Sequence, residues 1–240
     1  MRVIVVAQPA NHDTAAGVFL PLAYVRAADP DATVAIFPSD HFVHPEEPFV
    51  EAVREAMTAA TELRRIVLIG VVPDDLELDY GWITPGRQLT VNTPFRTSTV
   101  NAFVEKPSAT EAEAARRRGA LWNTMVLAGD VRTFWRLGSA YVPEIMVLLE
   151  RLGSAIRTAR EADVLNAVYE TMPSRNFSRD VLQHAGRALA VMALDGVDWS
   201  DCAPVLRPEP IVSAAAAISR ADGGSSGRHH AHGPGTAGLA

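Results

Sequence analysis

The order of apolar and polar residues along the first third of the chain predicts strands that alternate with helices. Short apolar runs that are typical of buried strands occupy residues 2–7, 32–37 and 66–73. Between them, residues 15–27 and 48–65 carry apolar side chains three or four positions apart, as in helices that bury one face. Such alternation predicts an α/β fold with a mainly parallel sheet and helices on both faces.

After Pro73 the pattern changes, although strands and helices continue. Strands are predicted at residues 80–83, 99–107, 124–129 and 187–194. Helices are predicted at residues 109–121, 130–142, 143–156 and 161–172. Thr14 is expected to cap the first helix. From Ser213 the chain is rich in Ala, Gly and Ser, so we expect a domain over residues 1–212 and a disordered tail over residues 213–240.

Composition narrows the classes of function. The 240 residues are 48% hydrophobic and 21% charged, an ordinary globular balance. A net charge of −6 argues against nucleic acid and against an anionic membrane surface as partners. The single cysteine, Cys202, permits no internal disulfide and fits a reducing compartment. Because no segment reads as an export signal or a membrane span, we expect a cytoplasmic protein.

Two aspartates are candidates for binding a hard cation. Asp40 follows the strand predicted at residues 32–37, and ligands of open α/β sheets lie beyond the carboxyl ends of strands. Carboxylate oxygens suit Mg²⁺, which shares its other positions with phosphate oxygens. Asp201, in the stretch "VDWSDC", could complete a two-carboxylate site. The alternatives are that Asp40 caps a turn or helix and that Asp201 lies in a polar loop.

Candidate binding residues occupy two further stretches. In "FVEKP", Glu105 could accept hydrogen bonds from sugar hydroxyls, and Lys106, the only lysine of the chain, could meet a phosphate. A lysine ammonium is a compact, mobile charge, whereas the arginine fork imposes a planar geometry. In "LWNTMVLA", the amide of Asn123 could bind vicinal hydroxyls. The alternatives are an exposed Glu–Lys pair of little energetic value and a strand-edge turn residue.

The order of these stretches is more specific than any one of them. "FPSDH", "DYGWI", "FVEKP", "LWNTMVLA", "FSRD" and "DWSD" follow one another as in the mannose-1-phosphate guanylyltransferases, a family of sugar-phosphate nucleotidyltransferases that the chain resembles over residues 3–204. "FVEKP" is identical to the family's motif, and "PSDH" resembles its P-A-D-H. "QPANHDTAAG" is similar to a segment that lies near the nucleotide in the family.

The resemblance implies a reaction in which mannose 1-phosphate and GTP give GDP-mannose and pyrophosphate. It implies that Asp40 and Asp201 hold Mg²⁺ and that Lys106 neutralises the sugar phosphate. It also implies that Glu105 and Asn123 hold sugar hydroxyls, and that the backbone of Gly81 passes close to the sugar. The implied fold is the Rossmann-like fold of nucleotide-diphospho-sugar transferases.

The family's Gly-rich G-G-x-G-T-R-L segment has no counterpart in this chain, which begins at what resembles the family's third strand. We therefore expect an N-terminally truncated fold and weak catalysis by the chain alone, because donors to the triphosphate are missing. Open strand edges would then favour a homo-oligomer or pairing with another chain. The alternatives are a non-catalytic sugar-phosphate-binding or regulatory relative and a gene remnant without a ligand.

Overall fold

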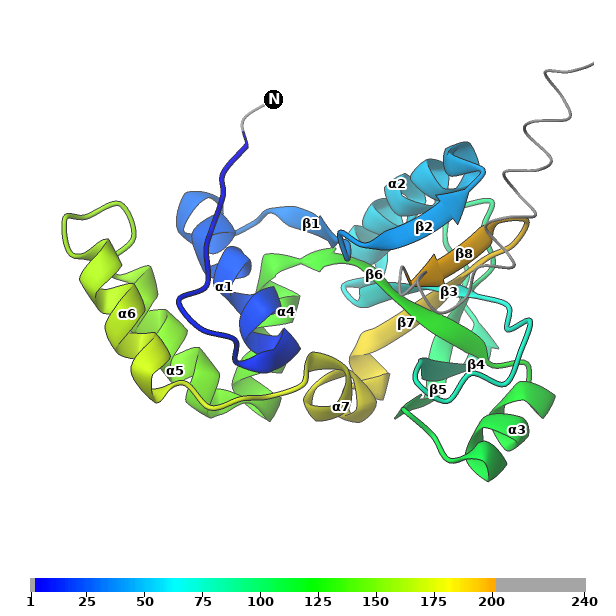
Figure 1. The fold of residues 1–240 in the computed structure, drawn as a ribbon. Helices are drawn as coiled ribbons and strands as arrows, with labels where there is room; N and C mark the ends of the chain where they lie inside the picture. The colour runs from blue at the N-terminus through cyan, green and yellow to red at the C-terminus, as the bar shows by residue number, and fades with distance from the viewer. Residues whose placement is uncertain (1–2, 202–240) are drawn as a thin grey trace, which may run out of the picture. The chain divides into compact units, whose positions relative to one another are not determined.

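A computed structural model describes residues 3–201. Residues up to Ser200 belong to one unit, and Asp201 belongs to a second. The predicted boundary between a domain at 1–212 and a tail at 213–240 lies outside the described residues. The helices and strands (Figure 1) are α1 (Asp13–Ala28), β1 (Thr33–Ile36), β2 (His41–His44), α2 (Glu46–Leu63), β3 (Ile66–Val71), β4 (Gly81–Gln88), β5 (Thr97–Glu105), α3 (Ala109–Arg117), β6 (Leu121–Asp130), α4 (Val131–Tyr141), α5 (Pro143–Gly153), α6 (Glu161–Thr171), α7 (Phe177–Asp180), β7 (Leu189–Leu194) and β8 (Asp198–Asp201), with 3-10 turns at Leu182–His184 and Gly186–Ala188.

Six of the strands form one sheet in the order β1-β6-β3-β7-β5-β4, and β2 pairs with β8 in a second, two-stranded sheet. Strands β3 and β7 are parallel, with Ile66 opposite Leu189. The neighbours β1–β6, β3–β6, β4–β5, β4–β6 and β5–β7 are antiparallel. The sheet is therefore mixed, and the expectation of a mainly parallel one is corrected. Apolar periodicity identifies a buried strand but does not encode the direction in which it runs.

Helices cover both faces of the large sheet, which confirms the α/β class. Along β3, Ile66 and Leu68 pack into one core, and Val67 and Ile69 pack into the other. The first core includes α1, α4, α5, α6 and α7, and the second includes α2 and α3 (Figure 1). Alternate residues of the strand face opposite sides because successive side chains of a strand point to opposite faces.

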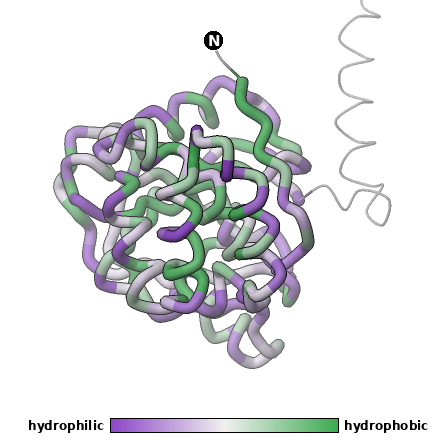
Figure 2. Tube along the Cα trace, turned by 90° about the vertical axis from the view of Figure 1, so that its left-hand side faces the viewer, coloured by the Kyte–Doolittle hydropathy of each residue, from purple (hydrophilic) through white to green (hydrophobic). Residues whose placement is uncertain are grey.

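The apolar stretch at the N-terminus does not join the sheet. Residues 3–7 are not in a strand, and Val3, Ile4 and Val5 are 75%, 62% and 87% exposed, so the predicted strand is wrong over its described part. Figure 2 shows this hydrophobic stretch in green beside the N label. A β-prone segment forms a strand only where a neighbour supplies the backbone partners.

Strand β1 lies at an edge of the sheet and pairs only with β6 within the described part of the chain. Its four residues are half-buried, unlike those of β3 and β7, which are all buried. An open strand edge presents backbone donors and acceptors to other chains. Pairing of this protein through such an edge stays a prediction, which size-exclusion chromatography over a range of protein concentrations tests.

The start of α1 differs from the expectation. His12 is the residue before the helix and makes no side-chain capping bond. Thr14, the predicted cap, lies inside the helix, where its Oγ1 accepts a hydrogen bond of 2.8 Å from the backbone N–H of Phe177. The threonine therefore fastens α7 to α1. None of the helices in residues 3–201 is long and apolar enough to cross a membrane.

Candidate functional site

A chain of aromatic contacts brings together motif segments that are far apart in the sequence. The ring of His41 lies 5.1 Å from that of Trp199, and Trp199 lies 5.3 Å from Tyr80. Tyr80 in turn lies 5.2 Å from Trp122 in an edge-on arrangement. These contacts join the residues next to Asp40, Gly81 and Asn123. We call the four rings the aromatic ladder.

Three of the residues expected to contact a sugar lie around one point. Gly81, at the start of β4, is opposite Glu105, at the end of β5. A Cβ atom on Gly81 would lie 2.8 Å from Oε2 of Glu105 and 3.2 Å from Cβ of Asn123. Only glycine leaves room for this arrangement without displacing a neighbour. The structure thus places Gly81, Glu105 and Asn123 in one group, which we call the rim cluster.

The rim cluster has hydrogen-bonding capacity that the chain itself does not use. Within residues 3–201, the carboxylate of Glu105 accepts no hydrogen bond that would stabilise its charge. The Oδ1 atom of buried Asn123 accepts from the N–H of Met125 at 3.2 Å, and no described residue accepts from its Nδ2. One acceptor and one donor are therefore available to a polar ligand such as a sugar.

The carboxyl of Glu105 has a raised pKa, as expected for a partly buried carboxyl group. Burial raises the pKa of its carboxyl, Lys106 and Arg179 act in the opposite direction, and Asp13 adds to the increase. Burial has this effect because a low-dielectric environment disfavours the charged form. Two cations and a second carboxylate therefore influence the ionisation of Glu105.

Lys106 follows β5 directly and carries an exposed positive charge. Its Nζ atom lies 3.8 Å from Oδ1 of Asp79, and the two side chains are 62% and 83% exposed. Its backbone N–H donates to the carbonyl of Tyr80 at 3.3 Å. An exposed pair at this distance contributes little, so the ammonium can exchange Asp79 for another anion at small cost.

Three non-glycine residues in or next to the candidate site have strained backbone conformations. Asp13, Lys106 and Met125 have φ angles of 64°, 49° and 55°, in the left-handed region that non-glycine residues rarely adopt. Such conformations cost roughly 1–3 kcal/mol each and persist where the surroundings enforce them, often at functional sites. Two other non-glycine residues of the described chain share this feature, Arg64 and Arg157. Arg64 terminates α2, which is a common place for it.

Helix α7 and the turn after it close one side of the rim cluster, and sequence reasoning missed this role. The hydroxyl of Ser178 donates to Sδ of Met125 at 3.1 Å, and the N–H of Glu105 donates to Oε1 of Gln183 at 3.0 Å. Nδ2 of Asn176 donates to Oδ1 of Asp13 at 3.2 Å. The signal that the sequence offers for this role is the resemblance of "FSRD" and "QPANHDTAAG" to family segments.

The two candidate cation ligands, Asp40 and Asp201, belong to different units of the chain. Asp40 is exposed in the connection between β1 and β2. Asp201 ends β8, is the last described residue and belongs to the second unit. No three His, Cys, Asp or Glu side chains within residues 3–201 are arranged to hold a metal ion. Mg²⁺ binding by Asp40 and Asp201 stays a prediction.

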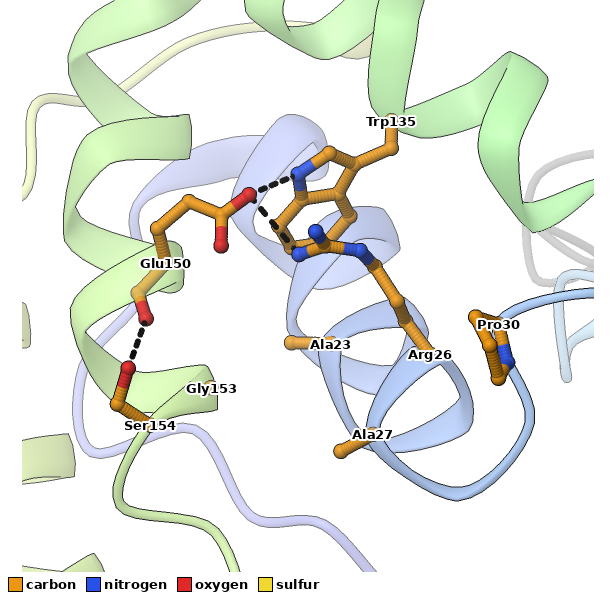
Figure 3. A pocket seen from close by; sticks show the side chains of 8 residues that line it. All are labelled: Ala23, Arg26, Ala27, Pro30, Trp135, Glu150, Gly153 and Ser154. Atoms are coloured by element: carbon orange, nitrogen blue, oxygen red, sulfur yellow. Dashed lines mark hydrogen bonds and ion pairs between the residues drawn. The ribbon is translucent and has the colours of Figure 1, made fainter.

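A cavity of about 300 Å³ lies elsewhere, between α1, α4 and α5 (Figure 3). It is lined by Ala23, Arg26, Ala27, Pro30, Trp135, Glu150, Gly153 and Ser154. The guanidinium of Arg26 lies 4.4 Å from the centre of the Trp135 ring, and Glu150 Oε1 accepts from both residues, at 2.9 and 2.6 Å. None of the predicted site residues lines it. We call Arg26, Trp135 and Glu150 the Arg26 clamp.

Comparisons with known proteins show the family to which the chain belongs. The family model described as nucleotidyl transferase matches residues 1–201, and the chain therefore belongs to that family. It is 26% identical over 204 residues to a mannose-1-phosphate guanylyltransferase of Klebsiella pneumoniae and 29% identical over 207 residues to one of Escherichia coli K12. In both cases the match covers 82% of this chain and 41% of the relative.

A solved structure shows the same fold at similar identity. The protein described as mannose-1-phosphate geranyltransferase of Thermus thermophilus superimposes with a TM-score of 0.70 at 28% identity. The match covers 82% of this chain and 54% of that one. The Rossmann-like nucleotidyltransferase fold is thereby confirmed. The chain spans about two fifths of the length of the curated relatives it matches.

Proposed function

We propose that this protein is a sugar-phosphate nucleotidyltransferase that converts mannose 1-phosphate and GTP to GDP-mannose and pyrophosphate. The observation that carries the proposal is the rim cluster, in which Gly81, Glu105 and Asn123 lie around one point and leave the Glu105 carboxylate and Nδ2 of Asn123 without a hydrogen-bond partner among the described residues. The names of the relatives support mannose 1-phosphate and GTP as the substrates.

The rim cluster would bind the sugar through its hydroxyls. The carboxylate of Glu105 would accept hydrogen bonds from vicinal hydroxyls, and Nδ2 of Asn123 would donate one. The missing side chain at Gly81 would let the sugar ring approach the backbone of β4. Because Glu105 is partly desolvated before binding, a ligand that donates to it relieves a cost already present in the free protein.

Lys106 would neutralise the phosphate of the bound sugar. In the reaction, a phosphate oxygen of the sugar attacks the α-phosphorus of GTP, the bond from that phosphorus to the β-phosphate oxygen breaks, and pyrophosphate leaves. The protein needs no covalent intermediate for this step. Its contribution is positioning and stabilisation of charge that develops in the transition state.

Asp40 and Asp201 would hold Mg²⁺, whose charge would screen the triphosphate. The donor chemistry of Asp40 fits, because its exposed carboxylate follows the end of β1 and Mg²⁺ commonly takes one or two carboxylates together with phosphate oxygens. The aromatic ladder runs from His41, the residue after Asp40, through Trp199 to Tyr80, the residue before Gly81.

Pyrophosphate release from GTP and mannose 1-phosphate, measured with and without Mg²⁺, tests the proposal. We expect release that requires both substrates and that Lys106→Ala and Asp40→Asn lower strongly, Lys106→Ala by roughly 100-fold. Calorimetry with each substrate alone separates binding from turnover. Binding of neither mannose 1-phosphate nor GTP by the folded protein would refute the proposal.

A non-catalytic sugar-phosphate-binding role is the second candidate. One observation favours it: the groups of the rim cluster that lack a hydrogen-bond partner are those expected to meet the sugar. This role predicts that mannose 1-phosphate binds while GTP does not, and that no pyrophosphate appears.

A further inference from the structure

Arg179 is oriented by bonds within the short helix α7. Its Nε donates to Oδ1 of Asp180 at 3.1 Å, and its backbone N–H donates to Oδ1 of Asn176 at 2.9 Å. Asp180 is itself fixed, because its Oδ2 accepts from the N–H of Asn176 at 2.8 Å. The side chain of Arg179 is 62% exposed. The guanidinium is therefore oriented from one side while most of it faces solvent.

The contacts of α7 and of the turn after it place this segment beside Glu105. Ser178, the preceding residue, is bonded to Met125 of β6, and Gln183 holds the N–H of Glu105. The interaction of Arg179 with the carboxyl of Glu105 is strong enough to oppose the increase in its pKa, as is that of Lys106. Glu105 thus has two cations near it, one from the residue that follows it and one from α7.

We propose that Arg179 and Lys106 together form the binding site for the phosphate of the sugar 1-phosphate, with Asp180 as the residue that positions Arg179. This inference rests on the proposed function for the identity of the sugar. A guanidinium offers two parallel N–H donors to phosphate oxygens, whereas the ammonium of Lys106 acts as a point charge. With Nε already engaged by Asp180, the terminal nitrogens of Arg179 remain for the anion.

Isothermal titration of the full chain with mannose 1-phosphate and with inorganic phosphate tests the inference. Arg179→Gln should weaken binding of both anions roughly tenfold to a hundredfold, as expected for loss of a charge-assisted hydrogen bond. Arg179→Lys should restore an intermediate affinity, because it returns the charge without the fork. Arg54→Gln, at an exposed arginine of α2, is the matched control and should leave both affinities unchanged.

Two further measurements separate binding from folding. The thermal unfolding midpoint of Arg179→Gln should match that of the wild type, because the side chain is mostly exposed. In the wild type, the Nε–Hε nuclear magnetic resonance signal of Arg179 should shift as inorganic phosphate is added, and this readout needs no variant.

The outcomes distinguish this inference from the proposed function. If Arg179→Gln binds both anions as tightly as the wild type does, the inference is wrong and the proposed function stands. A different result is that the wild type binds inorganic phosphate through Arg179 and binds mannose 1-phosphate no more tightly than phosphate. That result supports the anion site and contradicts the proposed sugar specificity. If the wild type binds neither anion, the inference is overturned, and pyrophosphate release then decides the proposed function.

Discussion

The rim cluster and the Arg26 clamp are both polar groups beside buried surface, yet they differ in how their hydrogen bonds are used. In the clamp, Glu150 accepts from Trp135 and Arg26, and the guanidinium also covers the indole ring. In the rim cluster, Glu105 and Asn123 keep unpaired groups. The clamp lines the 300 Å³ cavity, but its polar groups satisfy one another. Unused hydrogen-bonding capacity, rather than cavity volume, indicates the ligand site.

The largest expected effect comes from removing the ammonium of the rim. Lys106→Ala should lower the rate of pyrophosphate release by roughly 100-fold, because one well-placed donor to developing charge has about this effect. Arg26→Ala, the corresponding change in the clamp, should leave the rate per folded molecule unchanged. Initial rates at saturating substrate measure both. Equal losses of rate in Lys106→Ala and Arg26→Ala would show that catalysis does not depend on the rim more than on the Arg26 clamp.

The next effect comes from filling the space at Gly81. Gly81→Ala should weaken binding of mannose 1-phosphate by at least about tenfold, because the new methyl group displaces Glu105 or Asn123 from its position. Gly153→Ala, beside the clamp, has no atom within 4 Å of the added Cβ and is the matched control. Titration calorimetry measures both variants. Unchanged affinity in Gly81→Ala would show that the sugar binds elsewhere.

In the clamp, Glu150→Ala should reduce the free energy of unfolding by about 1 kcal/mol, typical of lost hydrogen bonds, without changing ligand affinity. Burial tends to raise the pKa of Glu150, but the hydrogen bonds from Arg26 and Trp135 prevail and lower it. The stabilisation is therefore present above the ordinary pKa of a glutamate and is lost as the pH falls through the lower, folded-state value. Urea unfolding at neutral and acidic pH should show the gap between wild type and variant closing in acid.

The smallest expected effect is a gain in stability rather than a loss. Because folding raises the pKa of Glu105, the ionised carboxylate costs stability at neutral pH. Its contribution is most favourable below the unfolded-state pKa and is lost as the pH rises through the folded-state value. Glu105→Gln should therefore stabilise the protein slightly at pH values of about 7–8 and not in acid, while it weakens sugar binding. A variant that is less stable than the wild type at neutral pH would contradict a functional role for this carboxylate's charge.

The sequence predicts buried strands better than it predicts how they are joined. Apolar runs locate β3 and β7 correctly, and these strands are fully buried. The same kind of run at residues 2–7 also predicts a strand, but residues 3–7 have no partner in the sheet. A local pattern reports that a segment is apolar, whereas strand formation and direction depend on a distant neighbour.

The rim cluster is predicted in part by the sequence. The resemblance singles out Gly81, Glu105 and Asn123, and the structure brings them together. Arg179 was missed, because its relation to Glu105 depends on how α7 packs against β5 and β6, across more than 50 residues of sequence. Motif order conveys which residues act, but contacts between distant segments become visible only in the fold.

The aromatic ladder also equips the protein with its own optical reporter. Trp122 and Trp199 contact Tyr80, and Trp82 lies 6.2 Å from Trp122, so three of the four indoles of the chain lie close to the rim. The fourth, Trp135, lies beneath Arg26. Trp82 directly follows Gly81 on β4, and Trp122 directly precedes Asn123 on β6. A shift of these strands on ligand binding would therefore change the surroundings of both indoles, whereas Trp135 lies on α4. Emission from the unlabelled protein can therefore follow a titration directly, and Trp135→Phe removes its constant background.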